Sequence, residues 1–239
     1  MVFNFKRYEK KYLVTNQQTA NVITALKERM VPDEYGTYWV QNLYFDTDNW
    51  DVIRKSMEKP LYKEKLRLRC YGEPDGDGNF FVELKKKYTG VVYKRRIALP
   101  ISAVKELLPN VKAKDDQQIA RELAFYLESN PVESRMYIAF KRTAFAGTDG
   151  EWLRVTFDTD IVYRQHDLDF SSPNVGQPVL PDGYQLMEIK THTSIPLWLS
   201  RILSENGIYR ISYSKYGTCF TDSCNRSAKT LTSSVADSA

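Results

Sequence analysis

The amino-acid sequence predicts an α+β domain whose antiparallel sheet closes into an eight-stranded β-barrel, with helices packed outside. Eight runs rich in β-branched and aromatic residues are separated by turn signals. Only four helical patterns occur, too few for an alternating α/β fold. In at least five of the strands, charged residues follow a two-residue period and apolar residues fill the alternate positions. Each of these strands therefore has one charged and one apolar face.

The predicted strands are bounded by turns rich in Gly, Pro and Asp. The turn at residues 72–78 has acidic residues spaced like the start of an EF-hand loop. In the run that begins at Asp75, the sixth position is Phe80 rather than Gly and the twelfth is Lys86 rather than Glu, so we interpret it as a hairpin turn. The strands are predicted at Tyr8–Val14, Thr37–Phe45, Lys65–Tyr71, Asn79–Lys86, Tyr93–Pro100, Ser134–Phe145, Leu153–Thr159 and Gln185–Lys190.

The helical patterns have recognisable ends. The first begins after a capping residue, Thr15 or Asn16, and the last ends at Gly207 in the C′ position. The folded domain is predicted to span residues 1–222, and the Ser/Thr/Ala-rich segment 223–239 is predicted to be a disordered tail. The helices are predicted at Gln17–Met30, Ala103–Leu108, Gln117–Leu127 and Leu197–Asn206.

Composition argues against several classes of protein. Three cysteines without a CxxC pair argue against a disulfide framework or a structural zinc site. No Walker A loop, GxGxxG or GxSxG motif occurs, and the two histidines lie in loop-like segments. The charged N-terminus and the lack of a long apolar run predict a cytoplasmic location. A membrane-protein partner and any oligomeric state remain compatible with the sequence.

The charged faces are dominated by Arg and Lys, with an occasional carboxylate. One interpretation is the solvated side of a sheet. If the barrel closes with these faces inward, the bore instead becomes a basic array that a polyanion would neutralise. Carboxylates beside such an anion require a bridging cation, Mg²⁺ or Mn²⁺, unless each one pairs with a neighbouring Arg or Lys. The faces carry Lys65, Arg67 and Arg69; Glu83, Lys85 and Lys87; Lys94 and Arg96; Arg154, Thr156 and Asp158; and Glu188 and Lys190.

An ordered set of fragments covering about residues 3 to 220 resembles the VTC-type polyphosphate polymerase domain, a member of the triphosphate tunnel metalloenzyme or CYTH-like superfamily. The resemblance implies a tunnel barrel in which the terminal phosphate of ATP passes to a growing polyphosphate, releasing ADP. The fragments are Arg7–Tyr12, Tyr44–Thr47, Lys65–Arg69 with Tyr71 and Gly72, Val82–Lys85, Lys94–Ile97, Leu186–Lys190 and Ser214–Tyr216.

The charge pattern and the resemblance together nominate the site residues. Glu188 is the principal expected metal ligand, and the expected cofactor is Mn²⁺ or Mg²⁺. The catalytic set is Lys11, Arg67, Arg69, Lys85, Lys190 and Lys215; the phosphate-binding set is Arg54, Lys94, Arg96, Arg142, Arg154 and Ser214; and the metal set is Glu188, Glu9, Glu83 and Asp158.

Two positions depart from the pattern of the superfamily. Arg7 occupies the first acidic position of its ExExK signature, and Ser212 stands where some members carry a further basic residue. Two other functions stay open: a triphosphatase that hydrolyses inorganic or nucleoside triphosphate, and a noncatalytic polyphosphate-binding module. We expect no nucleic-acid partner, because Trp39 and Tyr44 lie in strand patterns where core packing is their expected role.

Overall fold

The computed structural model describes residues 8–74, 80–89, 91–99, 118–148, 152–172 and 174–236. Arg7, the predicted helix Ala103–Leu108 and part of the predicted hairpin turn therefore lie outside the described residues. The helices are α1 (Asn16–Leu26), α2 (Asp51–Met57), α4 (Gln118–Ser129), α5 (Leu197–Glu205) and α6 (Lys215–Ala236). The strands are β1 (Tyr8–Thr15), β2 (Met30–Asp46), β3 (Tyr62–Tyr71), β4 (Phe80–Tyr88), β5 (Val91–Leu99), β6 (Glu133–Gly147), β7 (Leu153–Arg164), β8 (Gln177–Pro178), β9 (Tyr184–Thr191) and β10 (Arg210–Ile211).

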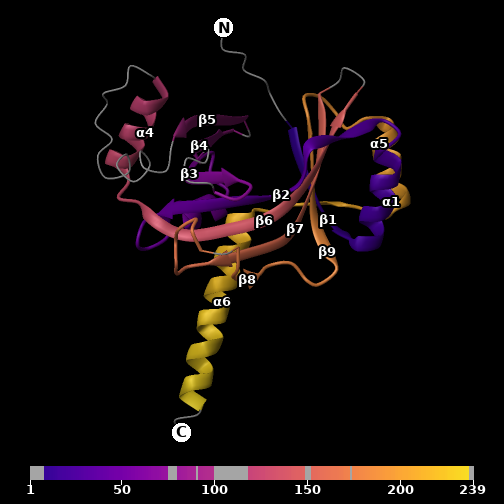
Figure 1. Cartoon of the computed structure of the whole chain (residues 1–239). Helices are drawn as coiled ribbons and strands as arrows, with labels where there is room; N and C mark the ends of the chain where they lie inside the picture. Colours follow the sequence, from indigo (N-terminus) through magenta and orange to yellow (C-terminus); the bar gives the residue numbers. More distant parts are fainter. Residues whose placement is uncertain are drawn as a thin grey trace.

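A single antiparallel sheet contains all ten strands, in the order β10-β1-β9-β7-β6-β2-β3-β4-β5, with β8 beside β7 (Figure 1). Each of the eight predicted strands overlaps an observed one. The sequence analysis missed the two-residue strands β8 and β10, the seven-residue helix α2 and the helix α6, part of which it predicted as a disordered tail. The long strands β2, β6 and β7 run through the middle of the sheet and connect its two ends.

The prediction of a closed barrel is wrong. The sheet ends at β10 and β5, and no pairing joins these two strands in the described part of the chain. β10 is too short to continue the ladder, since it pairs only with Lys11 and Tyr12 of β1. β5 pairs with β4 over its whole length and with no other described strand. The sheet is nevertheless strongly curved, so that its two ends face one another (Figure 1).

Two hydrophobic clusters cover the outer face of this curved sheet. Val155 of β7 and Ile189 of β9 belong to the first cluster, which includes residues of α1 and α5. Leu66 of β3 and Leu84 of β4 belong to the second, together with Leu123 of α4. All five side chains are almost completely buried. This packing places the alternate, charged positions of the same strands on the inner face.

A third cluster lies on the inner face and includes the first turns of α6. Phe140 of β6 and Leu186 of β9 belong to it with Tyr216, Cys219 and Phe220 of α6. The prediction that the helices pack outside is therefore corrected for α6. The helix then extends away from the sheet, and the segment expected to form a tail is helical as far as residue 236 (Figure 1).

No described helix combines the length and the apolarity needed to cross a bilayer.

The N-terminus of α1 is closed by a capping box. Thr15 Oγ1 accepts a hydrogen bond from the backbone N–H of Gln18 at 3.2 Å, and Gln18 Oε1 accepts one from the N–H of Thr15 at 2.9 Å. Two of the N–H groups that a helix leaves unpaired at its start are thus satisfied.

We predict that Thr15→Ala lowers the free energy of unfolding by about 1 kcal/mol, because it removes the hydroxyl that accepts the hydrogen bond from the N–H of Gln18. Urea denaturation followed by circular dichroism measures the change. Thr24→Ala is the matched control, since the Thr24 hydroxyl is exposed and bonds only the carbonyl of Ala20 within α1. Equal stability of the two variants would contradict the capping role.

Candidate functional site

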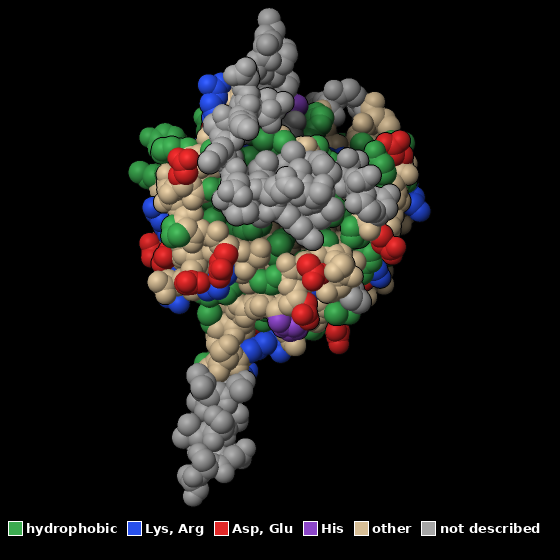
Figure 2. Space-filling model, turned by 60° about the vertical axis from the view of Figure 1, so that its left-hand side comes forward, with side chains coloured by type: hydrophobic (Ala, Val, Ile, Leu, Met, Phe, Trp, Pro, Cys, Tyr) green, Lys and Arg blue, Asp and Glu red, His purple; other side chains and the backbone are tan. Residues whose placement is uncertain are grey.

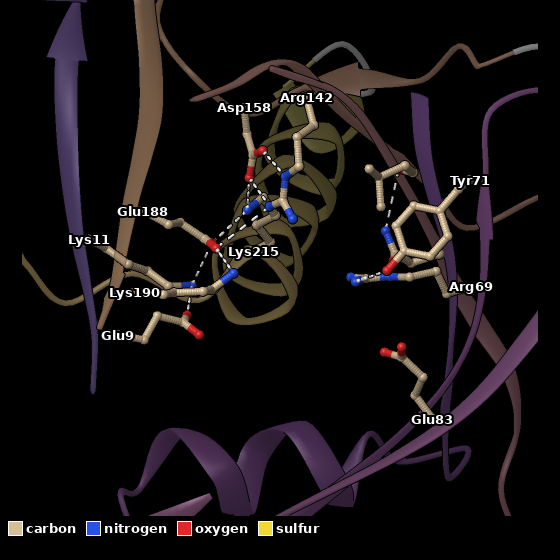
Figure 3. Close-up of polar contacts among 12 residues, drawn as sticks. Glu9, Lys11, Arg69, Tyr71, Glu83, Arg142, Asp158, Glu188, Lys190 and Lys215 are labelled. Carbon is tan, nitrogen blue, oxygen red and sulfur yellow. Dashed lines mark hydrogen bonds and ion pairs between the residues drawn. The ribbon is translucent and has the colours of Figure 1, made fainter. Parts of the chain in front are cut away.

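Charged side chains gather on the inner face of the sheet and at the start of α6 (Figure 3). On the surface visible in Figure 2, acidic and basic side chains are interspersed, whereas the group of charges on the inner face contains ten cations and four carboxylates from the described residues. The cations are Lys11, Lys65, Arg67, Arg69, Lys85, Lys94, Arg96, Arg142, Lys190 and Lys215, and the carboxylates are Glu9, Glu83, Asp158 and Glu188.

Glu188 lies at the centre of the first group. Its Oε1 is 3.2 Å from Lys11 Nζ and 3.0 Å from Lys215 Nζ. Its Oε2 is 3.1 Å from Lys190 Nζ and 3.6 Å from an Nη atom of Arg142. Burial alone would raise the pKa of this carboxyl, but the four cations hold it well below its usual range. Glu188 is therefore ionised at neutral pH. We call Glu188, Asp158, Lys11, Arg142, Lys190 and Lys215 the Glu188 cluster.

Asp158 secures the same cluster from the neighbouring strand. It is fully buried and accepts hydrogen bonds from Nε and Nη2 of Arg142, both at 2.7 Å. The two residues are direct cross-strand partners on β7 and β6. Lys215 Nζ lies 2.5 Å from Asp158, so Lys215 bridges Asp158 and Glu188. This lysine fixes the start of α6 to the sheet.

Glu9 extends the cluster toward solvent. Its Oε1 is 3.3 Å from Lys11 Nζ, so that Lys11 stands between the carboxylates of Glu9 and Glu188. Desolvation would raise the pKa of Glu9, but Lys85, Lys11 and Lys190 lower it to about 2 despite the nearby charge of Glu188. Lys85 belongs to β4 and Glu9 to β1, so this interaction connects the two ends of the sheet.

A second group, the Glu83 cluster, lies across the inner face from the first (Figure 3). Glu83 Oε2 accepts hydrogen bonds from Nε and Nη2 of Arg67 at 2.9 and 2.7 Å. Glu83 Oε1 is 2.7 Å from Lys94 Nζ and accepts a 2.7 Å bond from Arg96 Nε. Burial would raise the pKa of Glu83, but Arg67, Arg69 and Lys94 hold it well below its usual range. The cluster is Glu83, Arg67, Lys94 and Arg96.

Arg69 is oriented by neutral partners. Its Nε donates to Asn42 Oδ1 at 2.8 Å and its Nη1 donates to the Tyr71 hydroxyl at 3.3 Å. Arg96 also donates to this hydroxyl, at 2.8 Å. Burial would raise the pKa of Tyr71, but the two guanidinium groups lower it to about 8. The charge of Arg69 is thus held in place without a carboxylate of its own.

Three lysines form a row across neighbouring strands, and one of them, Lys94, belongs to the Glu83 cluster. Lys85 of β4 is the cross-strand partner of both Lys65 of β3 and Lys94 of β5. Like charges at opposite positions destabilise a sheet. Lys85 is open to water, yet protein surrounds it closely enough that desolvation, with Lys11 and Arg67, lowers its pKa although Glu9 opposes this. No carboxylate among the described residues forms an ion pair with Lys65 or Lys85. An added anion would relieve this repulsion.

The N-terminus of α6 adds further positive potential. Ser214 precedes the helix, and its Oγ accepts a hydrogen bond from the N–H of Gly217 at 3.3 Å. Ser214 therefore acts as the helix N-cap in this structure. The free N–H groups and the dipole of a helix N-terminus favour anions. This end of α6 lies beside the Glu188 cluster through Lys215.

Two predicted residues lie outside the two clusters. Arg54 is on α2, and its guanidinium lies 5.7 Å from the centre of the Phe220 ring. Arg154 is on β7 opposite Lys190, but its guanidinium pairs with Asp33 at 2.9 Å. The structure therefore brings together all of the predicted catalytic residues, with Lys94, Arg96, Arg142 and Ser214, but places these two arginines at the periphery.

The four predicted metal ligands do not form one group. Among the described residues, no set of three or more His, Cys, Asp or Glu could hold a metal ion. Glu9 and Glu188 nevertheless share one cationic group, Lys11, at 3.3 and 3.2 Å. Mg²⁺ at phosphate sites commonly takes one or two carboxylates together with phosphate and water oxygens. This pair fits such an ion, whereas Glu83 is enclosed by three cations on the other side of the site.

Sequence reasoning missed the polar residues that hold the arginines. Tyr44 accepts a hydrogen bond from Arg67 at 3.0 Å, and Asn42 and Tyr71 contact Arg69. Tyr44 and Asn42 alternate on β2 just as Arg67 and Arg69 alternate on β3. The two-residue period of β2 was the available signal, but aromatic residues there were assigned to core packing.

Subunit 4 of the vacuolar transporter chaperone complex from Schizosaccharomyces pombe is 20% identical over 221 residues, a match that covers 74% of this chain. The chain spans 30% of the length of that relative.

Solved structures show a similar fold. A Hippeastrum protein, named as a candidate adenylyl cyclase and described as having a dominant triphosphatase activity, aligns with a TM-score of 0.55 and 16% identity, covering 91% of this chain and 96% of the other. A candidate adenylate cyclase from Bacillus halodurans aligns with a TM-score of 0.53 and 15% identity, covering 86% and 92%. The model of the VTC domain matches residues 6–222, and the chain therefore belongs to the VTC domain family.

Proposed function

We propose that this chain is a metal-dependent polyphosphate polymerase, which transfers the terminal phosphate of ATP to the end of a polyphosphate. The observation that carries the proposal is the excess of cations on the inner face, above all the row Lys65, Lys85 and Lys94. A bound polyanion would supply negative charge and relieve the repulsion among these cations. The VTC domain match and the relative from the S. pombe complex support this choice.

The arrangement suits a chain of phosphates better than a single one. Glu188 and Glu83 lie on opposite sides of the inner face (Figure 3). Lys85 is close enough to Glu9 and Lys11 on one side and to Arg67 on the other to interact with all three. Arginine offers two parallel donors to phosphate oxygens and lysine offers a compact charge. In the proposed reaction, one cluster holds the triphosphate of ATP and the other orients the terminal oxygen of the acceptor.

The chemistry requires positioning and charge neutralisation. A polyphosphate end is already an oxyanion, so its attack on the terminal phosphorus of ATP needs no strong general base, and ADP is the leaving group. Glu188 and Glu9 would hold a divalent cation, Mn²⁺ or Mg²⁺, which when bound neutralises charge on the phosphate oxygens. Lys11, Lys190 and Lys215 then supply charge to the phosphates without taking or giving a proton.

The alternative is a triphosphatase that uses water as the acceptor in the same site. The Hippeastrum structure favours it, because that protein is described as having a dominant triphosphatase activity. A noncatalytic polyphosphate-binding module is the third candidate. A membrane-protein partner belongs to the proposal only, since the relative is a subunit of a complex and is much longer than this chain.

Incubation of the purified protein with ATP and Mn²⁺ or Mg²⁺ tests the proposal. We expect long-chain polyphosphate on a gel, with one ADP released for each phosphate added. Orthophosphate without polymer would assign the triphosphatase instead, and phosphate binding without turnover would assign the binding module.

We predict that Glu188→Gln abolishes metal-dependent turnover and retains tripolyphosphate binding. The change removes a metal-binding charge but leaves the surrounding cations, so attraction for phosphate is not reduced. Turnover is measured across a Mn²⁺ titration, and binding by calorimetry without metal. Glu122→Gln is the control, because this outer-face carboxylate also pairs with two cations, Lys86 and Arg95. Full activity of Glu188→Gln would refute the metal assignment.

We predict that Arg69→Ala weakens tripolyphosphate binding by roughly 10- to 100-fold, the value of a lost charge-assisted hydrogen bond. Arg69 has no carboxylate partner to satisfy, so its charge is available to the ligand. Arg95→Ala is the control, because Arg95 lies on the outer side of β5 and pairs with Glu122. If the two variants bind with equal affinity, Arg69 does not contact phosphate.

A further inference from the structure

Asp46, the last residue of β2, is a fully buried carboxylate. Its Oδ1 accepts hydrogen bonds from the backbone N–H groups of Thr47 and Val52, both at 2.9 Å. Its Oδ2 accepts one from the N–H of Ile53 at 3.0 Å and one from the hydroxyl of Tyr216 at 2.7 Å. In the described part of the chain no Lys or Arg forms an ion pair with it. Asp46 thus joins the start of α2 to the start of α6.

Tyr216 carries this connection into the phosphate site. Its ring stacks on Tyr44 with the ring centres 4.4 Å apart and the planes at 13°. Lys65 Nζ lies 5.6 Å from the centre of the Tyr216 ring and 3.5 Å from Ser214 Oγ. A cation at this distance from an aromatic face is attracted to it. The ring therefore gives Lys65 a fixed direction without neutralising its charge.

We propose that Lys65 is a further phosphate-binding residue and that Asp46 is a positioning residue, which acts through Tyr216 to place it. The inference rests on the function proposed above. Tyr44, held by the same ring, contacts Arg67 at 3.0 Å, so one buried carboxylate supports two cations of β3. This role is additional to the residues already assigned to the two clusters.

The charge of Lys65 supports the assignment. The groups that face it are Lys63 on its own strand, Lys85 on β4, Lys11 on β1, Asp46 on β2, and Tyr216 and Ser214 beside α6. Burial and the three lysines lower the pKa of Lys65 to about 7, and Asp46 opposes this shift. Lys65 is therefore charged below about pH 7 and neutral above it in the free protein. A bound phosphate favours the charged form, so the contribution of Lys65 to the affinity must fall as pH rises through and above this value.

Calorimetric titration with tripolyphosphate at several values between about pH 6 and about pH 9 tests the proposal. We expect Lys65→Met to weaken tripolyphosphate binding about tenfold at about pH 6. The variant should also lose the part of the decrease in affinity with rising pH that is due to deprotonation of Lys65. Lys65→Arg keeps the charge at every pH. Its affinity for tripolyphosphate should therefore exceed that of Lys65→Met and should decrease less with rising pH than that of the wild-type protein. Lys85, whose pKa is also lowered, and Lys94 and Tyr71, whose pKa values are lowered to about 8, contribute pH dependence that remains in every variant.

Asp46→Asn removes an anion that stabilises charged Lys65, so the fall in affinity should begin at a lower pH. Tyr216→Phe loses the hydrogen bond to Asp46 and should weaken binding at all pH values. The pH at which affinity decreases should not change, because the Asp46 side chain is still present. Tyr137→Phe is the matched control: it loses a buried hydroxyl that bonds Gln41 at 2.7 Å on the outer side of the sheet. If Asp46 contributes only to folding stability, Asp46→Asn will have a lower melting temperature, as Tyr137→Phe does, but the pH dependence of binding will not change.

Failure of the proposed function and failure of the inference about Lys65 give different results. Absence of tripolyphosphate binding by the wild-type protein overturns the proposed function. Wild-type binding together with unchanged affinity and pH profile in Lys65→Met and Lys65→Arg overturns this inference alone, and that pair of variants decides it even if Asp46→Asn does not fold.

Discussion

The buried contact of Lys215 with Asp158 and Glu188 is the interaction on which the rest of the structure depends. It joins the start of α6 to β7 and β9, and through Glu188 to Lys11 of β1. Removing one partner from such a network leaves an unpaired buried charge and costs about 3–5 kcal/mol. Because Lys215 is fixed, Tyr216 and Phe220 enter the apolar part of the inner face, where Tyr216 orders Tyr44 and the end of β2. Helix position and site geometry are thus set by the same charges.

The open sheet brings the two groups of charges together without strand pairing between its ends, and α6 packs against its inner face. The two ends of the sheet, β10 and β5, do not pair, yet Glu9 of β1 and Lys85 of β4 interact across the inner face. Helix α6 fills the apolar part of that face, and its N-terminus turns toward the charged part. The outer clusters bend the sheet by packing α1, α5 and α4 against it. The curvature of the sheet comes from packing on both of its faces and does not require hydrogen bonds between β10 and β5.

The two-residue period of the strands predicted which residues share a face, and the structure confirms this for Arg67 and Arg69. That period contains no information on register or curvature, so it predicted neither the three cations around Glu83 nor the unpaired edge of β5. Helix α2 was missed because Trp50 precedes it in a left-handed conformation, without a side-chain cap. Its cap is Asp46, which lies five residues before the helix and belongs to a strand. Such capping depends on tertiary structure and leaves no local signal.

The four carboxylates of the inner face also bear on how a polymer could move through the site. A site built only of cations would bind a phosphate chain so tightly that the chain could not advance, whereas conduction of a charged species needs several sites of moderate affinity. Glu83 and Glu188 each compete with the ligand for neighbouring cations, so a phosphate that enters must displace an existing ion pair. Each movement of the polyphosphate by one position then replaces an ion pair between a carboxylate and a cation of the site with an ion pair of similar energy between phosphate and that cation. For a polymerase that lengthens its product one phosphate at a time, this balance favours release of each position over permanent capture.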